Sequence, residues 1–262
     1  MKHKIWNLIQ EKIEQDGVLH STLIDPDLTF QTLNKIKKMI RYSLEAGTDI
    51  VMVGGSTIAD QISVDKTVKG IKEVILENGY NVPVIIFPGN INAFSKEADA
   101  VYFMSLLNSN NLYWIIRSHI IGAPMLKVWG LETISLGYII VEPGATAGFI
   151  GEAHLIPRNR KGYKIAASYA LAAEYFGFKM VYLEGGSGVD RCIPPEMVKY
   201  TSGFVDIPVC VGGGINNKEQ AEEYVKAGAK NIVQGTFIEK NVIKDQGTSL
   251  KEIIEAMKSK VG

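Results

Sequence analysis

The stretch VYLEGGSG (181–188) decides the fold, because it joins an apolar run to a turn with almost no side chains. A short apolar run that ends in glycine is typical of a buried strand followed by a tight connection. The same unit recurs along the chain. An apolar run is followed by a turn rich in Gly, Pro, Asn or Asp, and then by a stretch of helical periodicity.

Eight such apolar runs can be counted, and they are nearly continuous rather than alternating. Continuous apolar strands are expected in a parallel sheet that is buried on both faces. Eight strand–helix units in 262 residues predict an α/β protein, a (β/α)8 TIM-like barrel that forms one domain over residues 1–262. A doubly wound open sheet is the alternative. The predicted strands are VLHSTLI (18–24), DIVMVGG (49–55), PVIIFPG (83–89), AVYFMSLL (100–107), GYIIVEPG (137–144), MVYLEGG (180–186), IPVCVGGG (207–214) and NIVQGTF (231–237).

Amphipathic stretches separate most of these runs, and one gap is too short to hold a full helix. That gap, NINAFSKEAD (90–99), predicts a modified barrel in which a loop replaces the third helix. The first 17 residues show helical spacing and predict an added N-terminal helix. The remaining helices are expected at about 30–46, 60–78, 111–124, 162–177, 194–203, 217–228 and 248–260.

The bulk composition excludes several classes of protein. Lys+Arg and Asp+Glu both number 28, so no net charge favours nucleic acid as a partner. Cys192 and Cys210 lack the spacing of metal ligands, and we expect two reduced thiols in a cytoplasmic protein. No signal peptide and no run of about 18 apolar residues is present, so no transmembrane segment is expected.

Glycine turns after the last strands predict a phosphate site. In barrels of this kind, ligands bind at the carboxyl ends of the strands, and phosphate sites favour strands seven and eight. Gly212, Gly213 and Gly214 end one run, and Gly235 with Thr236 ends the next. Such turns expose backbone N–H groups in front of a helix N-terminus, which attracts anions. The same glycines could instead serve only to turn the chain.

The run at 181–188 adds a third glycine turn and a carboxylate. Ser187 offers a hydroxyl to the predicted phosphate site, between glycines that expose their backbone. Glu184 stands beside it, where a negative charge is unfavourable unless it has other work. It can accept a hydrogen bond from a substrate hydroxyl and take up its proton. The alternative is a salt bridge at the barrel rim.

A second anion site is suggested after the first two strands. LIDPD (23–27) places Asp25 and Asp27 at the end of the first run, and GGST (54–57) follows the second. Aspartates are also good helix caps, so we expect one of the two to cap or to face solvent. The other is suited to Mg²⁺, which prefers oxygen ligands and bridges carboxylates to substrate phosphates.

In order, the segments DPD, GGS, FPGN, FMSLLN, YLEGGSG, GGGI and GT resemble the geranylgeranylglyceryl phosphate synthase family and its bacterial heptaprenylglyceryl phosphate synthase relatives. The match runs from about residue 18 to 240, and the ordered set is specific although each segment alone is weak. The resemblance implies a modified (β/α)8 barrel without its third helix. Leu23, the Gly235–Thr236 ending and the longer chain before DPD are similar to the longer, archaeal-type branch.

The resemblance implies a prenyltransferase. It would join the C3 hydroxyl of sn-glycerol 1-phosphate to C1 of a polyprenyl diphosphate, most simply geranylgeranyl diphosphate, release pyrophosphate and make an ether-lipid precursor. Glu184 and Asp25 would be the catalytic residues, with Glu184 the candidate base. Glycerol 1-phosphate would be bound by Tyr182, Leu183, Glu184, Gly185, Gly186, Ser187, Gly188, Gly212, Gly213, Gly214, Gly235 and Thr236.

Further expectations concern the metal, the prenyl chain and the assembly. Mg²⁺ would be the cofactor, held by Asp25 and Ser56 and bridging to the diphosphate. The family also implies a homo-oligomer, a dimer or a hexamer, and transient contact with a membrane because substrate and product are lipids. An apolar groove for the prenyl chain would draw on side chains such as Phe87, Tyr102, Met104, Leu106, Trp129, Ile140 and Phe149.

Two other functions fit the same barrel. A phosphosugar isomerase or aldolase would share the phosphate site, but a Schiff-base aldolase needs a lysine on a strand, and no strand end offers one. A non-catalytic protein that binds a phosphate ligand is the third possibility. The presence of Glu184, Asp25 and both glycine turns argues against it.

Overall fold

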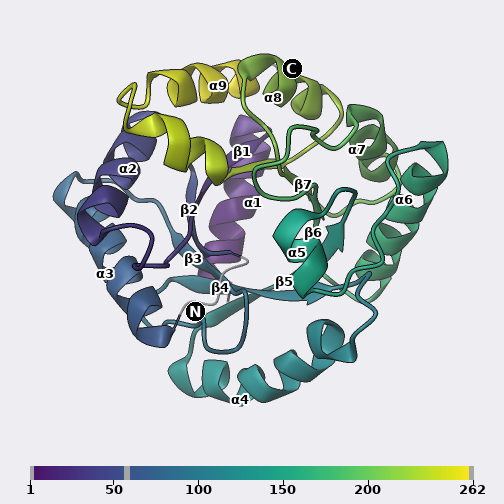
Figure 1. Cartoon of the computed structure of the whole chain (residues 1–262), viewed down its shortest axis with the longest axis horizontal. Coiled ribbons are helices and arrows are strands. Elements are labelled where there is room, and N and C mark those ends of the chain that lie inside the picture. The colour runs from purple at the N-terminus through teal and green to yellow at the C-terminus, as the bar shows by residue number, and fades with distance from the viewer. Residues whose placement is uncertain (1–2, 56–59, 260–262) are drawn as a thin grey trace.

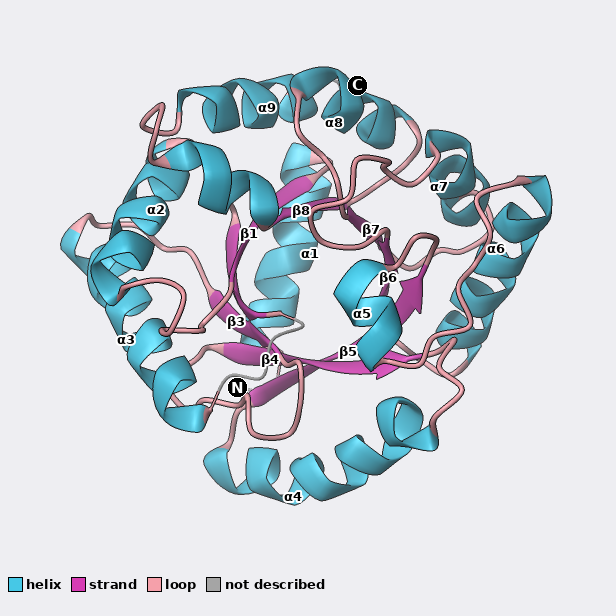
Figure 2. Ribbon diagram, viewed as in Figure 1, coloured by secondary structure: helices cyan, strands magenta, loops and turns pink. Residues whose placement is uncertain are grey.

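The computed structural model describes residues 3–55 and 60–259 and shows a closed eight-stranded parallel barrel surrounded by helices (Figures 1 and 2). This confirms the (β/α)8 architecture and excludes the open sheet. Each strand pairs in parallel with the next, and β8 pairs with β1. The strands are β1 Leu19–Ile24, β2 Ile50–Gly54, β3 Val84–Phe87, β4 Ala100–Leu106, β5 Glu132–Ile140, β6 Met180–Glu184, β7 Val209–Gly212 and β8 Asn231–Gln234.

The strand residues divide between two apolar layers, as alternation along a strand requires. On β6, Val181 and Leu183 face the helices, whereas Met180 and Tyr182 fill the barrel interior. Both layers are buried, which explains why the runs in the sequence are continuous. The outer layer consists of α2 Leu33–Glu45, α3 Gln61–Glu77, α4 Ser118–Trp129, α6 Arg160–Tyr175, α7 Pro195–Ser202, α8 Lys218–Lys226 and α9 Thr248–Lys258.

Polar residues set the starts of several helices. Thr32, Asp60 and Asn217 each accept a hydrogen bond from a backbone N–H three residues on, at α2, α3 and α8. These caps satisfy donors that the first turn of a helix leaves free. Between β3 and β4, residues 88–99 contain no helix, which confirms the predicted loop.

The region around β5 differs from the prediction in three ways. Strand β5 begins at Glu132 and ends at Ile140, not 137–144, because its first residues are only partly buried and did not stand out as apolar. The next residues form a short helix, α5 Ala145–Ile150, which the glycine-rich sequence concealed. The α4 region is also longer than predicted: η1, a π-helical segment (Tyr113–Arg117), precedes α4, which continues past Pro124 to Trp129.

The predicted N-terminal helix, α1 (Lys4–Asp16), closes the end of the barrel where the strands begin, and lies behind the strands in Figure 2. Ile5, Trp6 and Ile9 are buried against the barrel interior. The carboxylate of Glu132 accepts hydrogen bonds from the backbone N–H groups of Ile5 and Trp6 at 2.9 and 2.8 Å. A residue of β5 thus provides the acceptor for the first turn of α1.

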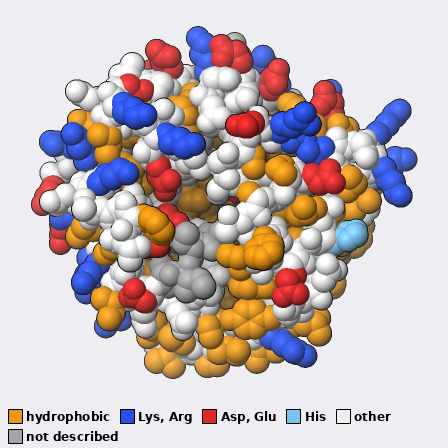
Figure 3. Space-filling view, in the orientation of Figure 1, with side chains coloured by type: hydrophobic (Ala, Val, Ile, Leu, Met, Phe, Trp, Pro, Cys, Tyr) orange, Lys and Arg blue, Asp and Glu red, His pale blue; other side chains and the backbone are white. Residues whose placement is uncertain are grey.

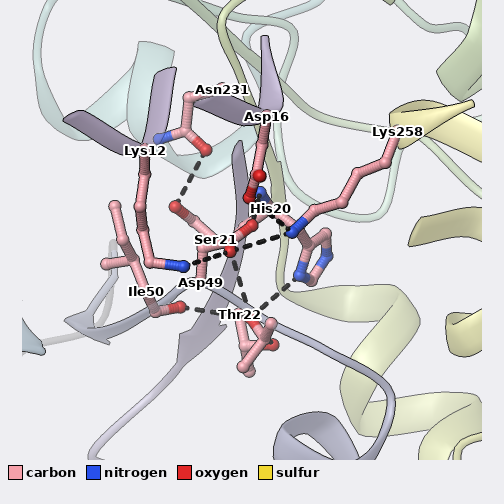
Figure 4. A network of polar contacts seen from close by, with 10 residues as sticks. Lys12, Asp16, His20, Ser21, Thr22, Asp49, Ile50, Asn231 and Lys258 are labelled. Atoms are coloured by element: carbon pink, nitrogen blue, oxygen red, sulfur yellow. Dashed lines mark hydrogen bonds and ion pairs between the residues drawn. The ribbon is translucent and has the colours of Figure 1, made fainter. Parts of the chain in front are cut away.

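A polar network at this closed end ties α1 to α9 (Figure 4). Asp49 is 2% exposed and contacts Lys12 and Lys258 at 2.9 and 3.0 Å. Burial raises the pKa of Asp49, but the His20 backbone N–H and the two lysines outweigh burial and lower it overall. A buried carboxylate with this many partners is strongly destabilising to disrupt. His20 Nε2, in the same network, lies 3.1 Å from the side-chain oxygen of Gln234, which connects the network to β8.

Candidate functional site

The carboxyl ends of the strands open on the face seen in Figure 3, where the surface is hollowed near its centre. Two pockets lie there side by side around the barrel mouth. One is polar and lies mainly over β6, β7 and β8, and the other is apolar and lies over β3, β4 and β5. We call them the polar pocket and the apolar pocket.

The polar pocket brings all three predicted glycine turns together. Its lining contains eight residues of the predicted glycerol phosphate site, which come from loops up to about 50 residues apart. It also contains Lys240 and Asn216, which the sequence analysis did not single out. The full lining is Leu23, Tyr182, Glu184, Ser187, Gly188, Val189, Asp190, Gly213, Gly214, Ile215, Asn216, Val233, Gln234, Gly235, Thr236, Phe237 and Lys240.

Four of the predicted binding residues do not line this pocket. Leu183 points away from the barrel interior into the outer apolar layer, where it is fully buried. Gly185 continues the backbone pairing and donates to the carbonyl of Gly212 at 3.0 Å. Gly186 donates its N–H to Glu184, and Gly212 makes room for Tyr182. A Cβ at Gly212 would lie 2.0 Å from the Tyr182 hydroxyl.

Glycine is required at Gly213 for two separate reasons. Its φ is +95°, in the left-handed region that favours glycine. A Cβ there would also lie 2.8 Å from the Gly186 nitrogen and 2.9 Å from Glu184 Oε1. The turns after β6 and β7 therefore approach each other too closely for any side chain. This close approach creates a pocket wall made of backbone.

Arg158, from the loop before α6, stabilises the turn after β6 through hydrogen bonds to its backbone. Its guanidinium donates to the carbonyl oxygens of Arg191 and Cys192, the former at 2.8 Å. The Cys192 thiol in turn donates to the carbonyl of Gly214 at 2.9 Å. Cys192 and Cys210 are both free thiols. The sequence held no periodic signal for Arg158, because its partners are backbone atoms of another loop.

Lys240 is the cation that the strand ends lack. It lies on η2, a π-helical segment (Ile238–Val242) that follows β8, and it is exposed at the rim of the polar pocket. An ammonium there complements backbone N–H groups in attracting an anion. The prediction considered each strand end and the turn directly after it, whereas Lys240 lies six residues after Gln234.

Glu184 lies at the floor of the polar pocket and is 6% exposed. Burial raises the pKa of Glu184, and this effect outweighs hydrogen bonds from the Tyr182 hydroxyl, the Gly186 N–H and the Tyr138 hydroxyl. The Gly186 bond, to Oε1, measures 2.6 Å. No cation within hydrogen-bonding distance of Glu184 appears among the described residues, so the rim salt bridge is not formed there. A buried carboxylate with a raised pKa is suited to take up a proton.

The apolar pocket extends from the barrel mouth towards η1 and α4. Four predicted groove residues line it: Phe87, Tyr102, Met104 and Leu106. Trp129, Ile140 and Phe149 do not line it: Trp129 packs in the outer layer, Ile140 in the barrel interior, and Phe149 is 86% exposed. The complete lining is Gly55, Phe87, Pro88, Gly89, Asn90, Ile91, Phe94, Tyr102, Phe103, Met104, Leu106, Trp114, Ser118, His119, Tyr138, Ala147, Ile150 and Gly151.

An aromatic cluster of Phe87, Tyr102, Tyr138 and Tyr182 lies between the two pockets and forms part of the wall of each. The Phe87 ring lies 5.5 Å from that of Tyr138 and 5.7 Å from that of Tyr182, centroid to centroid. Tyr138 and Tyr182 lie 5.3 Å apart in a T-shaped pair. Phe87, Tyr102 and Tyr138 line the apolar pocket, while Tyr182 lines the polar one. Ligands in the two pockets would therefore meet at these rings.

Asp25 follows β1 and is half-buried beside Gly55, at the end of β2. A Cβ on Gly55 would lie 3.2 Å from Asp25 Oδ2, so glycine keeps the space before this carboxylate oxygen open. Asp25 Oδ1 accepts the backbone N–H of Asp27 at 3.0 Å, and Asp27 in turn accepts from Thr29, as the expected local cap. Ser56, the other predicted metal ligand, lies outside the described residues.

The donor set at Asp25 fits a hard cation only in part. Carboxylate oxygen is a preferred ligand of Mg²⁺. Among residues 3–55 and 60–259, however, no group of three or more His, Cys, Asp or Glu is placed to hold a metal ion. Glu239 on η2 senses this carboxylate: burial and, after it, the charge of Asp25 raise the pKa of Glu239. A cation here would need oxygen ligands from a substrate as well as from the chain.

A closed (β/α)8 barrel with a glycine-lined pocket over its last strands belongs to the class of phosphate-binding TIM barrels. A family model described as the PcrB family matches residues 8–257, and the chain belongs to this family. The geranylgeranylglyceryl phosphate synthase of Thermococcus sibiricus is 44% identical over 256 residues, 97% of this chain and 96% of that one. The enzyme of that name from Pyrococcus furiosus is 48% identical over 236 residues, 90% of each chain.

A solved structure supports the same placement. The crystal structure of (S)-3-O-geranylgeranylglyceryl phosphate synthase from Thermoplasma acidophilum, in complex with its substrate sn-glycerol-1-phosphate, is similar with a TM-score of 0.88. It is 38% identical and covers 96% of this chain and 98% of its own. The resemblance inferred from the ordered motifs is thereby confirmed.

Proposed function

We propose that this protein is a prenyltransferase that joins the C3 hydroxyl of sn-glycerol 1-phosphate to C1 of a polyprenyl diphosphate, preferentially geranylgeranyl diphosphate. The observation that carries this proposal is the pair of unlike pockets that meet at one aromatic cluster beside the buried carboxylate of Glu184. A polar pocket suits a glycerol phosphate and an apolar one an isoprenoid chain. The names of the relatives agree with this assignment.

The residues of the polar pocket would orient the nucleophile. Backbone N–H groups of the glycine turns, Ser187, Thr236 and Lys240 would hold the phosphate near the rim. The glycerol carbons would then extend inwards to Glu184. Its carboxylate would accept the proton of the C3 hydroxyl while the oxygen bonds to C1. The bond from C1 to the diphosphate oxygen breaks, and its electron pair leaves with pyrophosphate.

The residues of the other half would bind the donor. The apolar pocket would bury the prenyl chain, and the aromatic cluster would place C1 next to the glycerol hydroxyl. Asp25, with Ser56, would hold Mg²⁺. When bound, this ion would neutralise the negative charge of the leaving diphosphate. The part of the chain that the structure describes includes no lysine on any of the eight strands, which disfavours a Schiff-base aldolase.

The test uses the purified protein, Mg²⁺ and labelled sn-glycerol 1-phosphate. Geranyl, farnesyl, geranylgeranyl and longer diphosphates are offered in parallel, and the product is extracted into organic solvent. We expect label in the organic phase, with geranylgeranyl diphosphate as the best donor, and loss of transfer with EDTA. No transfer from any donor, with glycerol phosphate still bound, would instead favour a non-catalytic phosphate-binding protein.

Asp25→Asn tests the metal assignment. The amide keeps the shape and the oxygen that accepts from Asp27, but removes the charge. We expect the Mg²⁺ concentration for half-maximal transfer to rise about tenfold or more. Mg²⁺ titration followed by calorimetry with an unreactive diphosphate provides a second measurement. A lower melting temperature with unchanged Mg²⁺ dependence would show that Asp25 only caps the turn.

The exposed side of η1 and α4 supports a homo-oligomer. Five large apolar side chains of this segment are exposed, and in Figure 3 hydrophobic atoms gather along the lower edge, over α4. Such a patch favours association of a dimer or hexamer, or transient contact with a membrane that holds the lipid substrate. No helix of the described chain is long and apolar enough to cross a bilayer. Light scattering after gel filtration measures the assembly. The five residues are Leu112, Ile116, Ile120, Ile121 and Val128.

A further inference from the structure

Tyr138 contacts both halves of the site, since its ring lines the apolar pocket and its hydroxyl contacts Glu184 of the polar pocket. It lies on β5, directly opposite Tyr182 of β6 in the strand register, and Glu184 is opposite Ile140 two residues on. Its side chain therefore points into the barrel on the same level as Tyr182. It is 5% exposed. The sequence motifs give no sign of this role, since GYIIVEPG (137–144) has no polar pattern around the tyrosine.

The ring of Tyr138 belongs to the apolar pocket. It lines that pocket together with Phe87 and packs edge-on against it, with the ring planes at 82°. Edge-to-face packing of this kind fixes the orientation of a ring. The ring is thus held at the inner end of the groove proposed for the prenyl chain.

The hydroxyl of Tyr138, in contrast, contacts the carboxylate of Glu184. It donates a hydrogen bond to Glu184, which also accepts from the Tyr182 hydroxyl and from the Gly186 N–H. A carboxylate has about four acceptor positions. Three donors from the chain therefore leave about one position, which is the number that a single substrate hydroxyl requires.

We propose that Tyr138 is a positioning residue that couples the two pockets: its hydroxyl orients Glu184 towards the C3 hydroxyl of glycerol phosphate while its ring bounds the place of the prenyl C1. This inference rests on the proposed function. It assigns a role to a residue outside the sequence motifs that pointed to that function. Substrate alignment and base orientation would then depend on one side chain. A shift of the ring by a bound donor would move the hydroxyl as well.

The titratable groups around Glu184 allow a pH test. Tyr138 faces it from β5 and Tyr182 from β6, with Cys210 of β7 and Tyr102 of β4 behind them, and Asp190 and Lys240 across the polar pocket. Burial raises the pKa of Tyr138, as do the charge and hydrogen bond of Glu184, so Tyr138 remains a donor. Its loss would favour the protonated, inactive form of Glu184.

The experiment compares pH profiles of kcat/KM for wild type, Tyr138→Phe and Tyr102→Phe. Tyr102 is the matched control because its hydroxyl is buried in the same cluster but has no hydrogen-bond partner among the described residues. For Tyr138→Phe we expect the acid limb to move up by about one pH unit, as loss of one hydrogen bond to a charged group predicts. The KM for the prenyl donor should stay within about twofold, because the ring remains.

A second variant tests the same hydroxyl if Tyr138→Phe is unstable. Site-specific 3-fluorotyrosine at position 138 preserves the ring and hydroxyl but makes the phenol a stronger donor. The acid limb should then move to lower pH, opposite to Tyr138→Phe. The two opposite shifts, with the midpoint of Tyr102→Phe unmoved, would support the proposal.

The outcomes separate this inference from the proposed function. Wild-type transfer with an unmoved acid limb in both position-138 variants would overturn the positioning role and leave the prenyltransferase intact. An equal shift in Tyr102→Phe would also overturn it, because the effect would then be general to the cluster. Absence of transfer by the wild type with every donor would overturn both.

Discussion

The two pockets at the barrel mouth are built by different means. In the polar pocket, glycine turns that follow β6, β7 and β8 contribute backbone to the wall. The wall of the apolar pocket is mainly side chains, drawn from β3, β4, β5 and the helical segments η1, α4 and α5. Backbone walls depend on a few glycines in fixed positions, whereas side-chain walls tolerate exchange of one apolar residue for another. The polar half should therefore be the less tolerant of substitution.

In the polar pocket, removing the base should lower kcat without changing substrate affinity. This fall in kcat is the largest effect we expect. Glu184→Gln keeps the size of the side chain and removes the base, so kcat should fall by about 10²-fold or more. The affinity for glycerol 1-phosphate, measured by calorimetry, should change little. An unchanged rate would remove Glu184 from the mechanism, and a loss of binding alone would make it a binding residue.

Substitutions in the apolar pocket should affect only the binding of the prenyl donor. Ala147 on α5 lines it, and Ala147→Trp would fill part of its volume. We expect the KM for geranylgeranyl diphosphate to rise about tenfold, with glycerol phosphate binding unaffected. The neighbouring Thr146 is exposed and absent from the lining, so Thr146→Trp is the control. Equal effects of both variants would contradict the assignment of this pocket to the donor.

The intolerance of the backbone wall can be measured with two glycines. Gly213→Ala would place a Cβ 2.8 Å from Gly186 and 2.9 Å from Glu184, whereas a Cβ at Gly177 meets nothing within 4 Å. Both positions have positive φ, +95° and +79°, so both variants carry the strain of that conformation. Gly213→Ala should cost about 1–3 kcal/mol more in unfolding free energy and weaken glycerol phosphate binding. Similar losses in thermal and binding assays would show that strain alone matters.

The smallest effect concerns His20, which belongs to neither pocket. Burial lowers its pKa from 6.5 to about 4, against the opposing effects of Asp49 and Gln234. The unfolded chain takes up this proton below pH 6.5 and the folded one does not, so stability is lost as the pH falls from 6.5 to 4. Between pH 7 and 5.5 this amounts to about 1 kcal/mol, or about 2 °C in Tm.

The variant that tests this effect is His20→Gln. Its stability should no longer show the loss between pH 7 and 5.5 that is due to His20. The exposed His154 provides the control variant, His154→Gln. Melting curves at several pH values, with ligand-free protein, measure both. Retention of the full pH dependence in His20→Gln would assign it to other groups. Neither pocket should change its ligand affinity at pH 7.

The barrel and the polar half of the site were accessible from the amino-acid sequence. Continuous apolar runs that end in glycine repeat eight times, and a parallel sheet is the structure that buries such strands on both faces. Glycines at Gly213 and Gly188 are local requirements of the backbone, so they appear as motifs. The missing third helix was equally visible, as a gap too short to hold one.

Side-chain contacts between residues far apart in the sequence were settled only by the folded barrel. Tyr138 and Glu184 are 46 residues apart in the chain, and the pairing of β5 with β6 in this register brings them together. Arg158 lies on a loop and Lys240 on the short segment η2, neither with a periodic signal, and α5 has a composition that resembles a turn. A local requirement of the backbone, such as a positive φ, can be recognised from the residues at that position and beside it. Contacts across the barrel depend on strand order and register, which no short segment contains.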